Sequence, residues 1–523
     1  MRFGWVAAAA ALLTMVFAGQ ASAASSIPED DSFYRLPNEK VLEKAKPGDI
    51  LRKRDVTVSL AGSPADTPST QVLYRTTNQL GEPTATVATI IRPAAPAGST
   101  RLLSYQTAYD GVASTCRPSY ALRTGNTGAN AIVQAEGSII SAYLLLGYTI
   151  VTSDYQGPSD DFGAGMEEGR GTLDAIRATE TALGASPGTV PTVLTGYSGG
   201  SIASMWAAQE APEYAPELKL LGVAAGGIPT DFAHNLDYIA GSPDWAGAIP
   251  AVGIGLARGS RIDLGKMLSE RGREIAATVQ QGCLDPGGFP GLKLEDMLKP
   301  EYQDWRKVPA LVKIFNESIM GRTGTPNIPM LMAVGNDDGT GDSVMIAKDV
   351  QELARTYCDR GLSVQYSELM GQDHTAAFVG FAPQAFSFVG QRFAGSAPGS
   401  DCPIAPGNPL TPLEEPGGKI GPTDGILVES IKVRKGKASV LVRATASDLN
   451  EVAVGLERKR KGGYEKFGSP TELTDQIVGY DGVRVNLRRK LKKGVKYRVV
   501  ATGRLQTDPV ETAAKVKKKR RKR

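Results

Sequence analysis

The segment Gly196-Tyr-Ser-Gly-Gly200 has the residue types of an activated serine nucleophile. It matches the pattern G-x-S-x-G, in which a sharp strand-to-helix turn lifts a serine hydroxyl above a sheet. The match alone is weak in a chain with 60 glycines. Its context strengthens it, because an apolar strand pattern (190–195) precedes the turn and a helical pattern (201–210) follows it. Ser198 is therefore a candidate nucleophile for acyl transfer.

A serine nucleophile needs a general base, and the chain has only two histidines. In folds built around this turn, the order along the chain is serine, acid, histidine. His374 follows a strand pattern (364–369) far C-terminal of Ser198, whereas His234 precedes every suitable carboxylate. We therefore expect His374 to be the base and His234 to be structural.

The acid that would orient the histidine has several candidates. Three carboxylates lie on the loop after the strand pattern 328–334, namely Asp337, Asp338 and Asp342. An acid on this loop would hold the imidazole, but aspartates in such places also cap turns and helices. Spacing leaves Asp342 and Asp338 as close alternatives, with Asp337 behind them. Asp373 is too near His374 in sequence to orient it easily.

Acyl transfer also needs donors for the oxyanion of the tetrahedral intermediate. One is expected to be the backbone N–H of Gly199, the residue after the serine. The other should come from the loop 105–111, which ends an early strand pattern (101–106) and lacks a run of glycines. Mechanism alone does not fix which residue of that loop donates.

The elements that must position these residues alternate between strands and helices. Strand patterns cover 101–106, 148–153, 190–195, 218–225, 328–334 and 364–369, and helical patterns include 171–183 and 201–210. This alternation is typical of a mostly parallel α/β sheet. The interval 229–326 has helical pieces and turns but no strand pattern. We therefore predict a helical cap inserted into a sheet domain that spans 24–402.

The N-terminus predicts export. An apolar run (3–18) follows Arg2, and Ala21-Ser-Ala23 has the small-x-small pattern of a signal-peptidase site. The run is shorter than the roughly 20 residues that a membrane span needs. We therefore expect residues 1–23 to be a signal peptide and the mature protein to be secreted, with association to the cell envelope as a further expectation.

The four cysteines fit an oxidising compartment. They are Cys116, Cys283, Cys358 and Cys402, and no two have the CxxC spacing of a zinc site. In an exported chain, two structural disulfides are the default, and the sequence alone allows three pairings.

Composition changes after Cys402. Residues 403–424 are rich in Pro and Gly and predict a linker. Residues 425–510 show the period-two alternation of a small antiparallel β-sandwich, and 511–523 form a basic tail that we expect to be disordered. We call 425–523 the basic module.

The basic module separates charge along the chain. It holds 27 Lys and Arg against 10 Asp and Glu, a net charge of +17, so the rest of the chain carries −13 within the total of +4. This asymmetry indicates an anionic cell-envelope surface, such as a wall polymer or anionic lipid, as a partner. Export argues against nucleic acid.

Several segments between about 100 and 402 resemble the secretory lipase family. They are Ser104-Tyr-Gln-Thr-Ala-Tyr-Asp-Gly111, Asp154-Tyr-Gln-Gly-Pro158, Glu167-Glu-Gly169 with Leu173-Asp-Ala-Ile-Arg177, Gly196-Tyr-Ser-Gly-Gly200 and Asp373-His-Thr375. The resemblance implies an α/β-hydrolase fold, lipase or esterase activity, a helical cap over an acyl-binding tunnel, and no metal. The basic module lies outside it.

The resemblance also bears on the alternatives that spacing leaves open. It favours Asp342 over Asp338, because Asp342 lies ahead of Cys358 as the family's acid does, although Ile346 replaces the family's proline. It implies Asp110 as the second oxyanion donor. It implies the disulfides Cys116–Cys283, which would join core to cap, and Cys358–Cys402.

Together these residues predict a secreted serine ester hydrolase, a triacylglycerol lipase or carboxylesterase, without a cofactor. Ser198 would form an acyl-enzyme on an acyl ester or lipid, with His374 and Asp342 as its partners. One alternative is another serine acyl-transfer enzyme, a peptidase or acyltransferase. An acidic pocket in the cap would favour peptides, and an apolar tunnel would favour acyl chains. Another alternative is a degenerate hydrolase that serves as an envelope-binding protein.

Removing the basic module should weaken binding to anionic surfaces at low salt. Each Lys or Arg close to such a surface contributes about 1 kcal/mol, and salt screens the attraction. Co-sedimentation with cells or anionic vesicles across a salt series would compare the full chain with a chain ending at Asp424. Equal binding by the two chains at low salt would show that the module is not an anchor.

Overall fold

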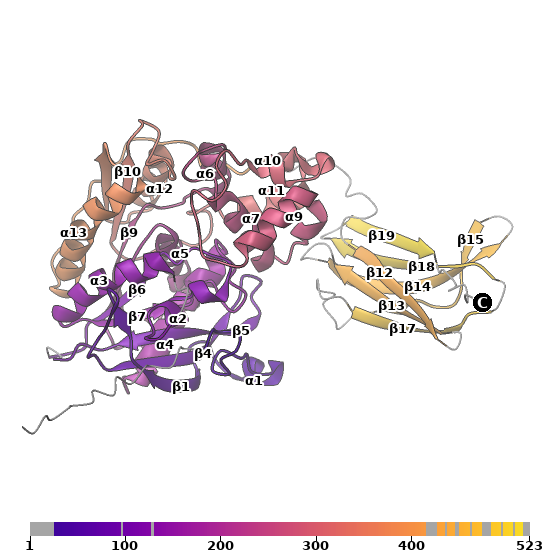
Figure 1. Ribbon diagram of the computed structural model, residues 1–523, viewed down its shortest axis with the longest axis horizontal. Coiled ribbons are helices and arrows are strands. Elements are labelled where there is room, and N and C mark those ends of the chain that lie inside the picture. The colour runs from indigo at the N-terminus through magenta and orange to yellow at the C-terminus, as the bar shows by residue number, and fades with distance from the viewer. Residues whose placement is uncertain are drawn as a thin grey trace, which may run out of the picture.

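The computed structural model describes residues 26–95, 98–126, 130–414, 426–434, 437–444, 449–460, 463–472, 483–492, 495–505 and 508–515. The predicted signal peptide, residues 415–424 of the predicted linker and the predicted tail from 516 onward lie outside the described residues. An α/β body contains the segments that carry the candidate residues, and the strands of the basic module lie to one side of it (Figure 1). Within the described ranges, no helix has both the length and the apolar content needed to cross a bilayer.

The body is built on one sheet of nine strands in the order β1-β4-β5-β7-β6-β8-β9-β10-β11. Neighbouring strands from β7 to β11 are parallel, whereas the pairs among β1, β4, β5 and β7 are antiparallel. The strands are β1 (Ile50–Val56), β4 (Ser69–Thr77), β5 (Pro83–Ile91), β6 (Leu102–Gln106), β7 (Thr149–Ser153), β8 (Thr192–Tyr197), β9 (Leu220–Gly226), β10 (Met330–Asn336) and β11 (Val364–Met370), beside a short hairpin of β2 (Ser59–Leu60) and β3 (Ser63–Pro64).

The side chains of the central strands alternate between two apolar cores. In β10, Met332 and Val334 belong to one core, and Leu331 and Ala333 belong to the other. Helices α4 and α12 pack in the first core, and α3 and α13 pack in the second. The helices of the body are α1 (Glu39–Lys44), α2 (Pro118–Ala121), α3 (Ala131–Leu145), α4 (Gly165–Ala182), α5 (Gly199–Tyr214), α12 (Ala347–Asp359) and α13 (His374–Phe393), with a 3₁₀ turn at Ser114–Cys116.

The predicted strands and the observed ones agree for β6 to β11, within two residues at each end. Sequence analysis missed the three antiparallel strands β1, β4 and β5. These strands extend the sheet on the side of β7 and do not carry the candidate residues.

The predicted cap is helical. Between β9 and β10 lie α6 (Phe232–Ile239), α7 (Ala248–Gly259), α8 (Leu264–Met267), α9 (Glu270–Val279), α10 (Leu294–Met297) and α11 (Pro309–Glu317), with 3₁₀ turns at Pro300–Tyr302 and Trp305–Lys307. We call residues 229–326 the cap. A disulfide between Cys116 and Cys283 joins the body to the cap, and it is the pairing that the resemblance implies.

The described part of the predicted linker, 403–414, packs against both the body and the cap, and we call it the strap. It starts at the second disulfide, Cys358–Cys402. Asn408 Nδ2 donates to Asp349 Oδ1 at 2.7 Å, and Asn316 binds both the backbone N–H and the carbonyl of Leu413. Apolar residues among the prolines, including Leu410 and Leu413, pack on the apolar core that body and cap share, which explains why the strap is held there.

The strands of the basic module form two antiparallel sheets. Valines and leucines of both sheets share one small core. The last strand, β19, contains residues 511–515, which the sequence analysis assigns to the tail. In the structure these residues are not part of a tail, because they pair with β18 in an antiparallel register. The strands are β12 (Ile426–Arg434), β13 (Lys437–Ala444) and β17 (Val483–Lys490) in one sheet, and β14 (Leu449–Arg460), β15 (Gly463–Lys466), β16 (Thr471–Glu472), β18 (Tyr497–Leu505) and β19 (Asp508–Lys515) in the other.

Replacing both Cys358 and Cys402 with serine should lower the free energy of unfolding of the body. The bond joins residues 44 positions apart. The chain-entropy relation gives about 4 kcal/mol for a loop of this length, as an upper value before native strain is counted. Urea denaturation of the two proteins under oxidising conditions measures the difference, and equal unfolding midpoints would contradict it.

Candidate active site

Ser198 lies at a strained turn between β8 and α5. Its backbone has φ 52° and ψ −123°, a region that residues other than glycine rarely occupy. The Ser198 N–H donates to Gly226 O at 2.9 Å, which ties the turn to β9. A Cβ atom on Gly196 would collide with the carbonyl of Gly200, and one on Gly200 would collide with the carbonyl of Gln106. The two flanking glycines of the motif are therefore required by close backbone packing.

The side chains of Asp342, His374 and Ser198 form a continuous hydrogen-bonded chain. His374 Nε2 lies 2.8 Å from Ser198 Oγ, and His374 Nδ1 lies 2.8 Å from Asp342 Oδ2. His374 begins α13, just after β11, and Asp342 lies on the loop after β10. The His374 N–H also donates to Asp342 O at 2.7 Å, so the two loops are joined through backbone and side chain. The structure thus brings together the three residues that sequence analysis favoured.

The other carboxylates near His374 have different surroundings. Asp342 is fully buried, and its Oδ1 accepts from the N–H groups of Val344 and Met345. Asp338 is exposed and accepts from Thr340 N, Gly341 N and the hydroxyl of Tyr238. Asp337 is exposed too, and Asp373 caps α13 through Ala376 N. Asp338 therefore caps a turn and Asp373 caps a helix, and of these four carboxylates only Asp342 forms a hydrogen bond with the His374 ring among the described contacts.

Asp110 lies on the loop after β6, against the turn that carries Ser198. Its Oδ1 occupies the space that a Cβ atom on Gly199 would need, and this oxygen is buried without a hydrogen-bond partner among the described residues. Burial raises the pKa of Asp110 to about 6, against the influence of the backbone N–H groups of Asp110 and Gly199 and of a positive charge on His374. The two residues expected to bind an oxyanion, Gly199 and Asp110, thus lie in direct contact.

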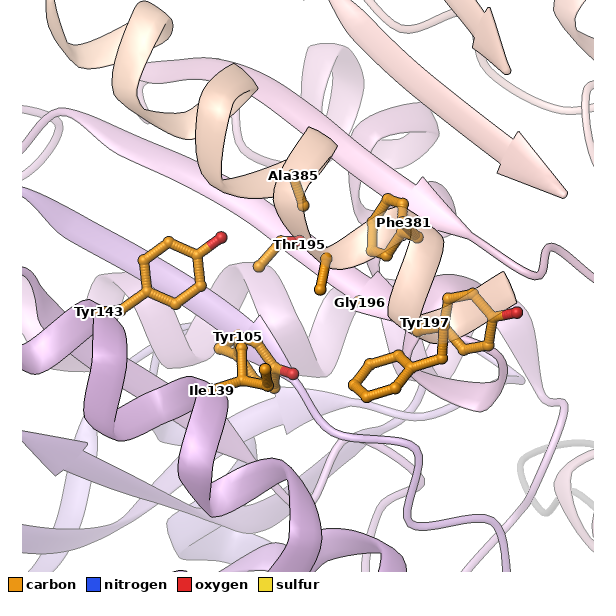
Figure 2. A pocket seen from close by; sticks show the side chains of 10 residues that line it. Tyr105, Ile139, Tyr143, Thr195, Gly196, Tyr197, Phe381 and Ala385 are labelled. Carbon is orange, nitrogen blue, oxygen red and sulfur yellow. The ribbon is translucent and has the colours of Figure 1, made fainter. Parts of the chain in front are cut away.

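Aromatic side chains pack against His374. The Tyr197 hydroxyl donates to His374 O at 2.7 Å, and the two ring centroids are 5.1 Å apart. Figure 2 shows the small cavity next to Tyr197, between α3 and α13, lined by rings such as Tyr143 and Phe381. Its volume of about 10 Å³ is the size of one water molecule, so it cannot hold an acyl chain.

Comparison with known proteins gives the family. The sequence profile of the secretory lipase family matches residues 122–401. Lipase 6 of Candida albicans is 34% identical over 401 residues, which cover 72% of this chain and 83% of that protein. A Mycobacterium tuberculosis protein named "probable inactive lipase" is 34% identical over 388 residues, covering 71% and 83% respectively. The chain belongs to the secretory lipase family.

A solved structure of this lipase type has the same fold. Candida antarctica lipase A in its closed state superposes with a TM-score of 0.67 at 27% identity, covering 75% of this chain and 92% of that one. The predicted α/β-hydrolase fold is confirmed. Membership of the family supports a secreted hydrolase of the lipase or esterase type. The family profile ends before the basic module.

His234 lies in the cap and contacts neither Ser198 nor Asp342 among the hydrogen bonds of the described residues. Its Nδ1 lies 2.9 Å from Asp349 Oδ2, on α12. The hydrogen bond to Asp349 raises the pKa of His234. Since Asp349 also accepts from Asn408, His234 helps to join cap, body and strap, which is a structural role.

Sequence analysis missed a set of buried carboxyl groups around the loop of Asp110. Glu136 accepts from Tyr105 Oη at 2.7 Å and from Ala108 N at 2.8 Å, so it holds that loop directly. Burial raises the pKa of Glu136 to about 8 and that of Asp154 to about 7. Asp154 begins one of the segments that carry the family resemblance, and that segment was a signal of its importance. Glu136 had no such signal.

A polar cleft of about 510 Å³ lies beside His374, between the cap and the loops after β10 and β11. Trp245 of the cap lines it and meets the His374 ring edge-on, with the centroids 5.2 Å apart. Four of its lining residues are carboxylates and none is basic; the carboxylates are Asp244, Asp337, Asp338 and Asp373. The cleft therefore disfavours anionic groups and favours neutral or cationic ones.

The free energy of unfolding should fall as pH rises from about 5 to about 8. In the unfolded chain these carboxyls lose their protons near pH 4. Burial raises their folded pKa to about 6 for Asp110, about 7 for Asp154 and about 8 for Glu136. The folded state therefore binds more protons across this range, and stability is lost as pH rises through the folded values.

Urea denaturation at a series of pH values measures this decline. Glu136→Gln removes one titrating group and should make the decline shallower. The matched change Glu270→Gln, at an exposed residue of the cap, should leave the slope as it is. If Glu136→Gln leaves the slope of the free energy of unfolding against pH unchanged, the Glu136 carboxyl does not contribute to the decline.

Proposed function

We propose that this lipase-family protein is an active, secreted carboxylic ester hydrolase, a triacylglycerol lipase or carboxylesterase, with Ser198 as its nucleophile. The observation that supports this most is the continuous chain from Asp342 through His374 to the Ser198 hydroxyl, with both links at 2.8 Å. Because the Asp342 carboxylate accepts from Nδ1–H, the other ring nitrogen is left to accept the serine proton. The acid thus fixes both the tautomer and the direction of the base.

The chemistry follows from these positions. Ser198 Oγ attacks the acyl carbon as His374 Nε2 takes its proton, and the same nitrogen returns a proton to the departing alcohol. Water, deprotonated in turn by His374, then releases the acid from the acyl-enzyme. Asp342 stabilises the imidazolium that forms in each half of the reaction.

The oxyanion would be bound by the backbone N–H of Gly199 and by Asp110. Support comes from the free protein, in which the Asp110 carboxyl occupies the place of a Cβ atom on Gly199, and the backbone N–H groups of both residues lower its pKa against the larger, opposite effect of burial. A substrate oxyanion in that place would meet the same donors. The Asp110 carboxyl must then be neutral or turned aside, since its own charge would repel the oxyanion.

The word "inactive" in the name of the mycobacterial relative concerns that protein. In this chain the nucleophile, base and acid are all present and in hydrogen-bonding contact, which favours an enzyme over a degenerate envelope-binding protein. The acyl tunnel implied by the family and the anchoring role of the basic module remain predictions.

One observation favours a second candidate, a serine peptidase. The cleft beside His374 has four carboxylates and two aromatic side chains, Tyr238 and Trp245, which suit a basic peptide side chain. Family membership favours the ester hydrolase. Turnover of lysyl p-nitroanilide peptides at a higher kcat/KM than p-nitrophenyl esters would reverse this order.

Ser198→Ala should lower kcat for p-nitrophenyl esters by at least about 10⁴-fold, because no other group supplies the nucleophile. Asp342→Asn should lower it by about 10³-fold to 10⁴-fold, because the amide favours the wrong tautomer of His374. The matched change Asp338→Asn, on the same loop but exposed, should retain most of the activity. A series of acyl-chain lengths measured on the wild type supplies the substrate preference.

Two results would overturn the proposal. One is the absence of turnover by the wild type with every ester tested. The other is turnover that Ser198→Ala leaves unchanged, which would place the reaction elsewhere.

A further inference from the structure

The loop that carries Asp110 is fastened to the cap. Leu284 N donates to Asp110 O at 3.0 Å, and Cys283 pairs with Gly111 as an isolated antiparallel bridge. The disulfide to Cys116 lies directly behind this pair. A Cβ atom on Gly111 would come within 3.0 Å of the Cys116 sulfur, so the loop, the disulfide and the cap are in tight contact.

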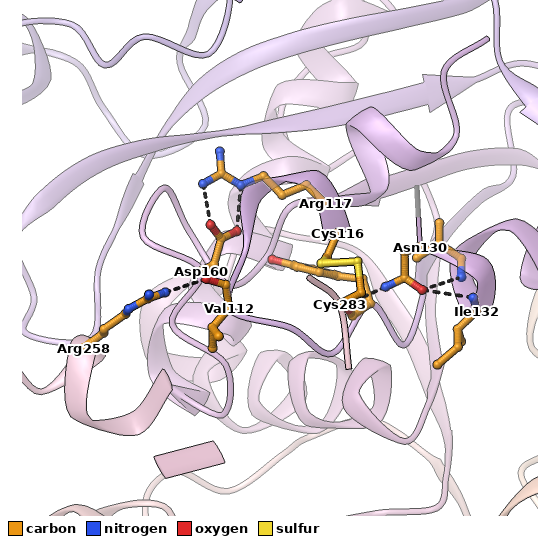
Figure 3. Close-up of a disulfide and its surroundings, with 10 residues drawn as sticks. Val112, Cys116, Arg117, Asn130, Ile132, Asp160, Arg258 and Cys283 are labelled. Atoms are coloured by element: carbon orange, nitrogen blue, oxygen red, sulfur yellow. Dashed lines mark hydrogen bonds and ion pairs between the residues drawn. A yellow bond between two sulfur atoms is a disulfide. The ribbon is translucent and has the colours of Figure 1, made fainter. Parts of the chain in front are cut away.

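Arg258 makes a second connection from the end of α7, in the cap. Its Nη1 donates to Val112 O at 2.8 Å and to Ser159 O at 3.0 Å, and its Nη2 donates to Gln280 Oε1 at 2.7 Å. One guanidinium thus joins two loops of the body to two segments of the cap. Figure 3 shows Arg258 and the disulfide approaching the same short loop from two sides.

The body holds the other end of the loop. Asn130 Nδ2 donates to Tyr109 O at 2.8 Å. The peptide between Tyr109 and Asp110 is planar, so the direction of the Tyr109 carbonyl fixes the opposite direction of the Asp110 N–H. Further along the loop, the carbonyls of Asp110 and Val112 both accept hydrogen bonds from residues of the cap. The orientation of the Asp110 N–H is therefore set between body contacts, at Ala108 and Tyr109, and two cap contacts, at Asp110 O and Val112 O.

We propose that Arg258 and the Cys116–Cys283 disulfide are positioning groups that hold the oxyanion donor Asp110 in register with Ser198 by fastening the cap to residues 110–112. This inference rests on the proposed function, and it gives the cap a second task besides covering the site. Neither group touches substrate. Their loss changes the direction of a donor that acts on the transition state.

The test separates donor alignment from folding and from substrate binding. Arg258→Met keeps the apolar stem of the side chain and removes the guanidinium with its three hydrogen bonds. We expect kcat for p-nitrophenyl acetate, per active site titrated with a phosphonate, to fall by about 10-fold, with KM within twofold. The Ki of a short alkylboronic acid, a tetrahedral mimic, should rise in parallel with the loss of kcat/KM.

Further variants keep the inference testable if Arg258→Met folds poorly. Arg258→Lys restores the charge and part of the bonding, so it should recover part of kcat. The double change Cys116→Ser/Cys283→Ser should lower kcat per titrated site in the same direction as Arg258→Met.

Two controls show what a purely structural loss would do. Arg306→Met removes another cap arginine, which pairs with Asp237 and stacks on Trp305. Cys358→Ser/Cys402→Ser removes the disulfide at the strap. Both should leave kcat per titrated site and the boronic acid Ki unchanged at a temperature where the proteins are folded.

The outcomes distinguish this inference from the proposed function. If the wild type hydrolyses no ester or is not titrated at Ser198, the proposed function fails. If the wild type is active while Arg258→Met and the double serine variant keep its kcat per site and its boronic acid Ki, the positioning inference alone is overturned.

Discussion

The backbone of Ser198 is the constraint on which the rest of the site depends. A residue with φ 52° and ψ −123° stores about 1–3 kcal/mol of strain, and it persists only where its surroundings allow no alternative. Here β8 lies near the centre of the sheet, with β6 and β9 on its two sides. The turn cannot relax without separating Gly200 from the carbonyl of Gln106 and breaking the hydrogen bond to Gly226. The packing of the sheet therefore offsets the strain and keeps the Ser198 hydroxyl directed at His374.

The parallel order of the sheet brings the partners of Ser198 to the same edge. The carboxyl ends of parallel strands lie together, so the loops after β8, β10 and β11 meet although Ser198 and His374 are 176 residues apart. The final alignment is local. His374 N donates to Asp342 O while His374 Nδ1 meets Asp342 Oδ2, so one residue pair fixes both the helix start and the ring. Tyr197, next to the nucleophile, then binds the carbonyl of His374 and ties the two segments together.

Sequence patterns predicted the parts of the fold and site that depend on local information. The apolar runs predicted strands β6 to β11. Because the chain has only two histidines, the order serine, acid, histidine identified His374 as the candidate base. Spacing could not choose among Asp337, Asp338 and Asp342, because the choice depends on how one loop turns. In that turn Ser343 has φ 75°, and the N–H groups of Val344 and Met345 donate to the Asp342 carboxylate. That choice came from the family resemblance.

Contacts with residues far apart in the sequence, or with backbone groups, leave no recognisable pattern in the sequence. Arg258 donates to the carbonyl of Val112, which lies 146 residues away, and any residue offers the same carbonyl. The strap looked like a linker because Pro and Gly dominate it, while a few leucines and Asn408 decide where it packs. Strands β4 and β5 are rich in β-branched residues but carry none of the candidate residues, and the run of charged residues in β1 hides its strand pattern.

The two positions that follow Ser198 each require glycine, but for different physical reasons, and the difference explains how the site is assembled. Gly200 has no room for a side chain because it packs on the backbone of β6, so it serves the strained turn. Gly199 has no room because the carboxyl of Asp110 occupies that space. Any side chain at 199 would displace Asp110, whose loop the cap and Glu136 hold from the other side. Gly199 is therefore where the sheet, which positions the proposed nucleophile Ser198, meets the cap-bound loop, which positions the proposed oxyanion donor Asp110. A substitution there would disturb the oxyanion side while leaving the contact between Ser198 and His374 in place.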